Sequence, residues 1–340
     1  MRYTMLFPLV LIGTPVLADV PTPLPNPAIH ATKASVSPMM SLAQTSNGMI
    51  AVGNRGHVLY SPSGKGEWQQ AKVPVSTMLT RVVMVNDSLG WALGHDATIL
   101  RTDDGGASWQ VQQWLPEVEI PLLDAHFFDS DNGITVGAYG QLFRTADGGK
   151  HWQFEFLDSL LIEDDRLYLE EIREESEQDY LAERAAMLPH INGITELKDG
   201  SLFIVGEMGL MARSTDQGKT WTRLPEVYFG SLLDMVETQG GDWVAFGLRG
   251  NVFQSTDQGQ SWYPLEVDTL STFNGGRVMS DGSVILVANG GILARRKKDS
   301  DDFVVHQVAK GQDLVDVVEG QPGQYWVVGS HGVQDITIKQ

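Results

Sequence analysis

The chain has 340 residues, with 43 acidic and 24 basic side chains, a formal net charge of −19 and no cysteine. This length is enough for one large core or two domains, and the missing cysteines exclude disulfides, thiolate metal sites and cysteine nucleophiles. The acidic surplus argues against nucleic acid as a partner, because few basic groups are available to neutralise phosphates.

The N-terminus has the pattern of a secretory signal peptide. Arg2 precedes an apolar run from Met5 to Leu17, which is too short to span a bilayer. We expect residues 1–18 to be cleaved and the protein to be periplasmic, without inserting into the membrane; a retained anchor is the alternative. Residues 19–27 contain four prolines and are expected to form a stiff, extended leader.

A repeat of about 41 residues organises the rest of the chain. An Asp-box pattern, Ser/Thr-x-Asp-x-Gly-x-x-Trp, recurs four times, and worn copies lie at 61–68 and 296–303. A second pattern, Gly-x-x-Gly or a close variant, precedes each box. Its first positions are Gly53, Gly94, Gly137, Gly206, Gly247, Ala288 and Gly329. Seven copies at this period predict an all-β fold, a seven-bladed β-propeller with four strands in a blade, over residues 28–340.

The Asp boxes are expected to be structural. The carboxylate can accept hydrogen bonds from the backbone of its own turn, and the tryptophan can cover the loop. One carboxylate for each turn supplies too few oxygen ligands for Ca²⁺. The residues assigned to these boxes are Asp104, Trp109, Asp147, Trp152, Asp216, Trp221, Asp257 and Trp262.

The last repeat is short, with eight residues after Gly332. We therefore expect residues 28–36 to supply the missing outer strand of the last blade and to close the ring, which would remove an exposed sheet edge.

A long insertion follows the Asp box of the third blade, at about residues 155–188. Residues 155–184 contain twelve acids and three bases, and their apolar side chains fall near helical spacing. We predict one long amphipathic helix or a helical hairpin. The insertion is either a solvated arm or a partner-binding arm, and the second interpretation assigns Tyr168, Leu169 and Ile172 to the contact.

Partner-binding residues are also expected in the Gly-x-x-Gly turns, which should ring one mouth of the central channel beside the insertion. The candidates are Arg55, His95, Asp96, Tyr139, Glu207, Met208, Arg249 and His331. Aligning the inner strands places Asp124, Asp234 and Asp316 at one position, with Arg81 as its counterpart. These side chains could form an acidic collar in the channel or could cap strand ends.

The sequence shows no catalytic motif. The eight histidines are scattered, and neither a zinc motif, a nucleophile elbow nor a phosphate loop is present. We predict no catalytic residue, metal site or cofactor. The alternative is a sialidase-like glycoside hydrolase, because Asp boxes also occur in those propellers. Such an enzyme needs an arginine cluster and a tyrosine–glutamate pair.

The segments 135–152 and 205–221 follow a pattern similar to that of photosystem II stability/assembly factor-like propellers with BNR repeats. The resemblance implies a non-enzymatic scaffold that holds a membrane protein during assembly. The photosynthetic members carry an arginine-rich patch, whereas Arg55 and Arg249 stand at the comparable turns here. The sequence looks more like the exported, non-photosynthetic bacterial members, for which the resemblance implies an RND/MMPL-type transporter as partner.

Overall fold

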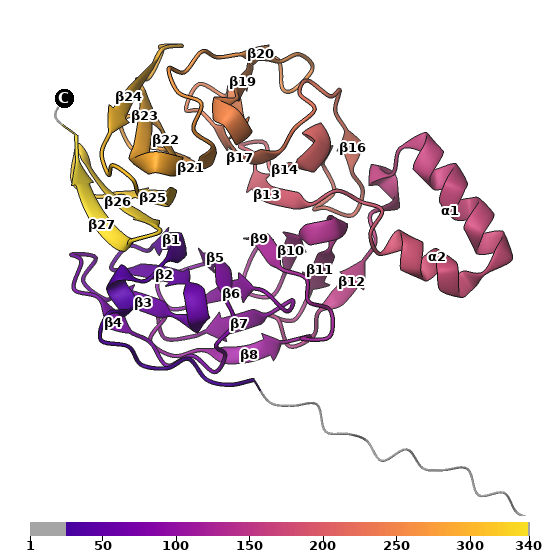
Figure 1. Ribbon diagram of the computed structural model, residues 1–340, viewed down its shortest axis with the longest axis horizontal. Helices are drawn as coiled ribbons and strands as arrows, with labels where there is room; N and C mark the ends of the chain where they lie inside the picture. Colours follow the sequence, from indigo (N-terminus) through magenta and orange to yellow (C-terminus); the bar gives the residue numbers. More distant parts are fainter. Residues whose placement is uncertain (1–24, 339–340) are drawn as a thin grey trace, which may run out of the picture.

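The computed structural model describes residues 25–338, in which the strands form seven antiparallel sheets arranged as a ring (Figure 1). The predicted all-β, seven-bladed propeller is confirmed. The predicted signal peptide (1–18) and most of the Pro-rich leader lie outside the described residues. Among residues 25–338, no helix is both long enough and apolar enough to cross a membrane.

The first three blades run from the innermost strand to the outermost. Blade 1 contains β1 (Met39–Gln44), β2 (Met49–Gly53), β3 (Val58–Ser61) and β4 (Gln69–Gln70). Blade 2 contains β5 (Leu79–Met84), β6 (Gly90–Gly94), β7 (Ile99–Thr102) and β8 (Gln110–Gln113). Blade 3 contains β9 (Leu122–Phe127), β10 (Gly133–Gly137), β11 (Leu142–Thr145) and β12 (Gln153–Glu155).

The remaining blades repeat this order. Blade 4 contains β13 (Ile191–Glu196), β14 (Leu202–Gly206), β15 (Met211–Ser214) and β16 (Thr222–Arg223). Blade 5 contains β17 (Leu232–Glu237), β18 (Trp243–Gly247), β19 (Val252–Ser255) and β20 (Tyr263–Pro264). Blade 6 contains β21 (Phe273–Val278), β22 (Val284–Ala288), β23 (Ile292–Arg296) and β24 (Phe303–Gln307). Blade 7 contains β25 (Leu314–Glu319), β26 (Gln324–Gly329) and β27 (Gly332–Thr337).

The apolar core lies between the blades. The buried residues form seven clusters, and each cluster joins two neighbouring blades. The second strand of each of the first six blades is buried at every position, because neighbouring blades cover both of its faces. Because no blade can bury its apolar faces alone, each blade is stabilised by packing against its two neighbours in the ring.

The predicted closure by residues 28–36 is wrong, because blade 7 has three strands. This segment instead lies along blade 1, where the Ala28 and Ala31 N–H groups donate to the Val73 carbonyl and to the Gln70 side chain, at 3.0 and 2.8 Å. It then forms the 3₁₀ turn η1 (Ala34–Val36), which packs against β27. The segment bridges the first and last blades without pairing as a strand.

Direct packing of β1 against β25 closes the ring. The Asp316 carboxylate accepts hydrogen bonds from the Leu42 N–H at 2.9 Å and from the Ser41 hydroxyl at 3.2 Å. Trp68 and Trp326 meet edge to face, with ring centroids 6.1 Å apart. These contacts join blades 1 and 7 through side chains, as the other blades are joined.

The insertion is a helical hairpin that projects from the rim of the ring (Figure 1). It contains the 3₁₀ turn η4 (Asp158–Leu160), α1 (Glu163–Glu175) and α2 (Glu177–Arg184). The Ser176 hydroxyl accepts a hydrogen bond from the Asp179 N–H at 3.2 Å and so caps α2. Of the two predicted forms, the hairpin is therefore the one observed.

Candidate partner-binding face

The Gly-x-x-Gly segments and their variants form tight turns between the second and third strands of a blade, and those of blades 1 and 3 to 6 are 3₁₀ turns. In five of the seven turns the third residue is not glycine and has a left-handed backbone, with φ between 53° and 59°. These residues are Arg55, Asp96, Tyr139, Met208 and Arg249. Asp96 is half-buried, and the other four side chains are exposed. A left-handed conformation is costly for residues other than glycine, so the ring holds these side chains outward against a local preference.

The first glycine of each motif is needed for a different reason. Gly53 has an extended backbone with φ −177°, but a Cβ there would lie 2.4 Å from the Pro38 carbonyl oxygen. The same close approach recurs at Gly137, where a Cβ would lie 2.4 Å from the Pro121 carbonyl oxygen. Glycine is thus required so that the turn can lie against the segment that enters the inner strand.

One hydrogen bond fixes the turn in every blade. The N–H group after the first motif position donates to the carbonyl just before the inner strand, at 3.0 or 3.1 Å. The donors are Asn54, His95, Ala138, Glu207, Leu248, Asn289 and Ser330. The turns and the connections between blades therefore make one face of the ring, called here the turn face. A rigid face of this kind suits binding, because little side-chain or loop ordering is required on contact.

The insertion adjoins the turn face between blades 3 and 4. A Cβ on Gly140, which has φ 64°, would lie 2.5 Å from the Leu188 side chain. Beside this contact the Tyr139 and His190 rings meet edge to face, with centroids 4.6 Å apart. The His190 Nδ1 atom lies 3.4 Å from the Glu207 carboxylate. The structure thus brings together Tyr139 and Glu207, two of the predicted residues, with His190, which the turn pattern did not include.

An exposed apolar set continues from this cluster over blades 3 to 6. Tyr139 and Met208 are 45% and 54% exposed, and Phe229 and Leu270, in the next two blade connections, are 71% and 86% exposed. Sequence reasoning missed Phe229 and Leu270. The available signal was that both are large apolar residues at the same position of the repeat, 41 residues apart.

The hairpin presents both charge and apolar surface. Tyr168 is 46% exposed, and Leu167 and Leu181 are 54% and 49% exposed. Leu169, in contrast, is 3% exposed, so it packs inside the hairpin and does not offer surface to a partner. Ile172 is half-buried. The predicted apolar stripe is therefore divided between an inner side that holds the hairpin together and an outer side that faces solvent.

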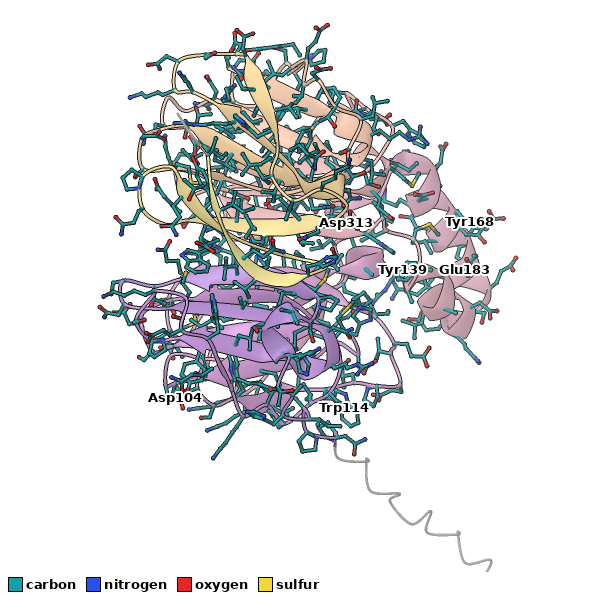
Figure 2. The ribbon with its side chains drawn as sticks, turned by 60° about the vertical axis from the view of Figure 1, so that its left-hand side comes forward. Asp104, Trp114, Tyr139, Tyr168, Glu183 and Asp313 are labelled. Carbon is teal, nitrogen blue, oxygen red and sulfur yellow. The ribbon has the colours of Figure 1, made fainter. Side chains whose placement is uncertain are left out.

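The other candidate turn residues lie on separate blades. Arg55 is on blade 1, His95 and Asp96 on blade 2, Arg249 on blade 5 and His331 on blade 7. They share the turn face with the cluster at Tyr139 but do not join it. Figure 2 shows Tyr139 and Asp313 on the side of the ring that also carries Tyr168 and Glu183 of the hairpin, with Asp104 on the other side.

The Asp boxes make the opposite face. In blade 5 the Ser255 hydroxyl accepts from the Gly259 N–H at 2.8 Å, and the Asp257 carboxylate accepts from the Ser261 N–H at 2.8 Å. In blade 4 the Trp221 ring N–H donates to the Gly218 carbonyl at 3.1 Å. The Ser261 hydroxyl and N–H lower the pKa of Asp257 to about 2. The box residues satisfy their own turn, which is a structural role.

A charged collar narrows the central channel. Arg81 Nε lies 2.7 Å from the Asp124 carboxylate, and Arg81 and Arg277 approach Asp316 at 3.9 and 3.6 Å. Burial raises the pKa of Asp234 to about 7, although Arg81 lowers it. Cavities of about 230 and 350 Å³ lie on the two sides of the collar, and Arg81, Asp234 and Asp316 line both.

Two collar carboxylates also join blades. Asp124 accepts from the Ile194 N–H of the next blade at 3.0 Å, as Asp316 does from Leu42. The collar expected for this position is therefore present, whereas these two hydrogen bonds reach N–H groups within the inner strand of the next blade and do not cap strand ends. Within residues 25–338 no group of three or more histidine and carboxylate side chains is arranged to hold a metal ion.

Comparison with known proteins agrees with this architecture. The family model of photosynthesis system II assembly factor YCF48 matches residues 61–120 and 190–337. Two proteins named photosystem II assembly protein Ycf48, from Synechococcus sp. strains JA-3-3Ab and JA-2-3B'a(2-13), are 42% identical over 48 residues and 41% identical over 54 residues. The matched segments cover 14% and 16% of those relatives, and 14% and 15% of this chain.

Solved structures match over nearly the whole chain. YCF48 bound to a D1 peptide has a TM-score of 0.66 at 15% identity, covering 94% of this chain and 100% of that one. YCF48 from Cyanidioschyzon merolae has a TM-score of 0.69 at 14% identity, covering 92% and 98%. Streptogramin B lyase reaches 0.69 at 11% identity, covering 92% and 97%, so these likenesses show the fold alone. Because the family model covers more than half of its residues, this chain belongs to the family of photosynthesis system II assembly factor YCF48.

Proposed function

We propose that this protein is a non-enzymatic assembly or accessory scaffold that binds a membrane protein through the turn face and the acidic hairpin. The observation that carries the proposal is the rigid turn face itself. It holds an exposed tyrosine and methionine in left-handed conformations beside a hairpin that has its own exposed tyrosine and leucines. Aromatic residues and methionine are enriched at the centres of protein interfaces.

The family supports a protein as the ligand. Its matching members are named as assembly factors, and one of the similar structures is a complex of YCF48 with a D1 peptide. For this chain, a hairpin with twelve acids and three bases over residues 155–184 suits a partner that presents basic groups. We further propose a periplasmic location and, more specifically, an RND/MMPL-type transporter as the partner; the apolar run at the N-terminus and the resemblance to exported bacterial members support these finer points.

The sialidase-like alternative lacks the necessary arrangement. The two channel arginines, Arg81 and Arg277, contact Asp124 and Asp316, so their charge is already compensated. Within the described residues, the cavities beside the collar are not lined by a tyrosine. A glycosidase would need a tyrosine–glutamate pair near an arginine cluster.

Affinity capture from solubilised membranes tests the proposal. The bait is the full chain, compared with a variant in which residues 163–186 are replaced by a Gly/Ser bridge. We expect one integral membrane protein to be enriched by the full chain and at least tenfold less by the variant, with weaker capture as salt rises. Equal capture by both chains would show that the hairpin does not contribute to binding.

A further inference from the structure

The Asp box of blade 6 has lost the residues that define the motif. Arg296 pairs with Val284 just as Ser255 pairs with Trp243 in blade 5, so Arg296 occupies the Ser/Thr position. Lys298 then stands at the aspartate position and Phe303 at the tryptophan position. The loop keeps one left-handed position of an intact box, since Asp299 has φ 61° and its counterpart Gln258 has φ 60°, but Ser300 stands where intact boxes have a glycine with positive φ.

These replacements change the charge at two positions of the motif, although Asp299, Asp301 and Asp302 follow in the same loop. In intact boxes the aspartate carboxylate lies within the turn, whereas here a lysine stands in its place and an arginine replaces a neutral hydroxyl. Other hydrogen bonds replace those to the box carboxylate. The Ser300 N–H donates to the Lys297 carbonyl at 3.3 Å, and the Asp302 N–H donates to the Ser300 hydroxyl at 3.1 Å. The aspartate position of this box therefore carries a lysine, and the loop is held by other hydrogen bonds.

Arg296 is a buried cation that forms no direct ion pair within residues 25–338, although the Asp301 and Asp242 carboxylates lie near enough to raise its pKa. It is 4% exposed. Its hydrogen-bond acceptor is the Gln254 side chain, and it lies over the Phe303 ring at 5.6 Å. Burial lowers its pKa, although Asp301, Asp242 and Tyr263 act in the opposite direction. A buried charge is costly unless it is paired.

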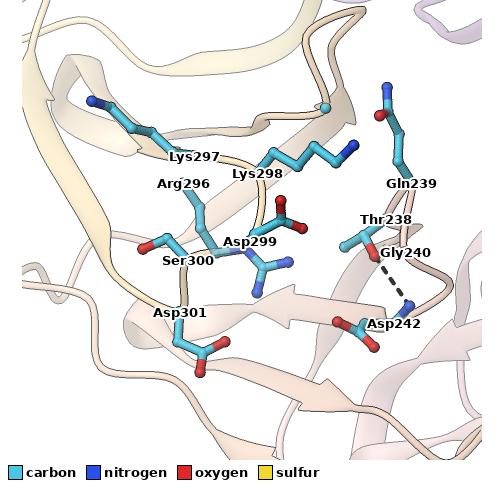
Figure 3. A pocket seen from close by; sticks show the side chains of 11 residues that line it. Thr238, Gln239, Gly240, Asp242, Arg296, Lys297, Lys298, Asp299, Ser300 and Asp301 are labelled. Atoms are coloured by element: carbon cyan, nitrogen blue, oxygen red, sulfur yellow. Dashed lines mark hydrogen bonds between the residues drawn. The ribbon is translucent and has the colours of Figure 1, made fainter.

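A small cavity opens beside this guanidinium (Figure 3). Its volume is about 70 Å³, several times the space that one water molecule needs. Its walls are the worn loop and the turn of blade 5 from Thr238 to Asp242. Lys297 and Lys298 add positive charge, and Asp242, Asp299 and Asp301 add negative charge. Asp242 is already engaged, because it accepts from the Gln254 amide at 3.4 Å.

We propose that the cavity between the worn Asp box of blade 6 and the blade 5 turn binds one small oxyanion, a phosphate or a carboxylate group, with Arg296 as its main ligand. A planar guanidinium binds such groups through two parallel hydrogen bonds. The anion supplies the charge that the box carboxylate supplies in blades 2 to 5. The site is on the Asp-box face, so it is independent of the proposed partner-binding face.

Anion titration tests this site. Inorganic phosphate, sulfate and acetate are added to the full chain at constant ionic strength, with chloride as the reference, and binding is followed by calorimetry and melting temperature. We expect saturable binding of phosphate or acetate and a melting temperature higher by about 4 °C at saturation. Which of the two binds more tightly distinguishes a phosphate from a carboxylate ligand.

The matched control rebuilds the box. Arg296→Ser with Lys298→Asp restores the hydroxyl and carboxylate positions of the motif, while Ser300 and Phe303 remain at its glycine and tryptophan positions. This variant should fold and bind each anion at least tenfold more weakly. If the rebuilt box does not fold, Arg296→Met in the otherwise native loop serves as the second variant, with the same expected loss. Equal binding by the native chain and either variant, or no binding by the native chain above the chloride reference, would overturn the proposal.

Discussion

The ring and the hairpin differ in how much of their surface is buried and in what holds them in place. In the ring, every neighbouring pair of blades shares an apolar cluster, and the same backbone hydrogen bond recurs at each turn. The hairpin is attached through Leu157, Leu160 and Leu188, which belong to the cluster between blades 3 and 4. Beyond these residues most of its surface is exposed and acidic. The comparison teaches that the ring needs its repeated residues to fold, whereas the hairpin beyond its base contributes surface.

The ring should be sensitive to loss of one Asp-box tryptophan. Trp221 is 3% exposed and belongs to the cluster between blades 3 and 4. We expect Trp221→Ala to lower the free energy of unfolding by about 3–5 kcal/mol, because it removes a large buried side chain. Urea unfolding gives the measurement, with Phe154→Ala, at a site that is 40% exposed, as the control. Equal losses in the two variants would contradict the assigned role of the tryptophan.

Asp234 should make the ring less stable as pH rises. Its pKa is raised from 3.8 to about 7 by burial, so the folded state holds a proton that the unfolded state has released between these values. Stability therefore falls from pH 4 to pH 7. We expect Asp234→Asn to remove this loss and to be more stable than the native chain above pH 7, by on the order of 2 kcal/mol.

Thermal unfolding from pH 4 to pH 8 measures this effect. Asp268→Asn, at an exposed position, is the control and should follow the native pH profile. An Asp234→Asn profile parallel to that of the native chain would show that the collar carboxylate is ionised throughout.

The Asp-box carboxylates should make the ring less stable as pH falls, which is the opposite of the pH dependence expected from Asp234. Hydrogen bonds from Ser261 hold the pKa of Asp257 at about 2, below its ordinary 3.8. The stability that it contributes is present above pH 4 and is lost as pH falls toward 2. We expect Asp257→Asn to have a lower melting temperature than the native chain at pH 5, with the difference shrinking by pH 2. A constant difference would indicate that the box does not depend on the charge.

The smallest effect on stability is expected from the hairpin. Replacing residues 163–186 by a Gly/Ser bridge leaves Leu157, Leu160 and Leu188 in place, and a change in loop length costs about 0.6 kcal/mol for each doubling. We expect the free energy of unfolding to change by less than about 1 kcal/mol. A larger excision, from 157 to 188, would also remove the three buried leucines and should destabilise the ring. If the shorter excision prevented folding, the ring and the hairpin would not be separable.

The repeat made most of the fold predictable. Because the Asp-box and Gly-x-x-Gly residues recur at a fixed period, blade number, strand order and the place of the hairpin followed from spacing. The way the ring closes was not predictable in this way. Counting residues shows that a strand is missing from the last blade, but it does not show that Asp316 and the pair Trp68–Trp326 can join blades 1 and 7 without a fourth strand.

The candidate site was predictable in outline. The turn pattern identified Tyr139, Glu207 and Met208, but it contained no signal for His190, Phe229 or Leu270, which lie in the connections between blades and not in the turns. Helical spacing likewise grouped Leu169 with Tyr168, although hairpin formation buries the first and exposes the second. Which side of a helix faces its neighbour depends on the connection between helices, here at Ser176, and this was not visible in the periodicity.

Site-specific photo-crosslinking tests the central claim, that partners bind the turn face and not the Asp-box face. A photoreactive residue replaces Met208 on the turn face or, as the matched control, the exposed Lys150 in the Asp box of blade 3. After irradiation in cells, cross-linked proteins are identified by mass spectrometry. We predict that Met208 becomes linked to an integral membrane protein and that Lys150 does not. The same product from both positions, or from Lys150 alone, would contradict the account.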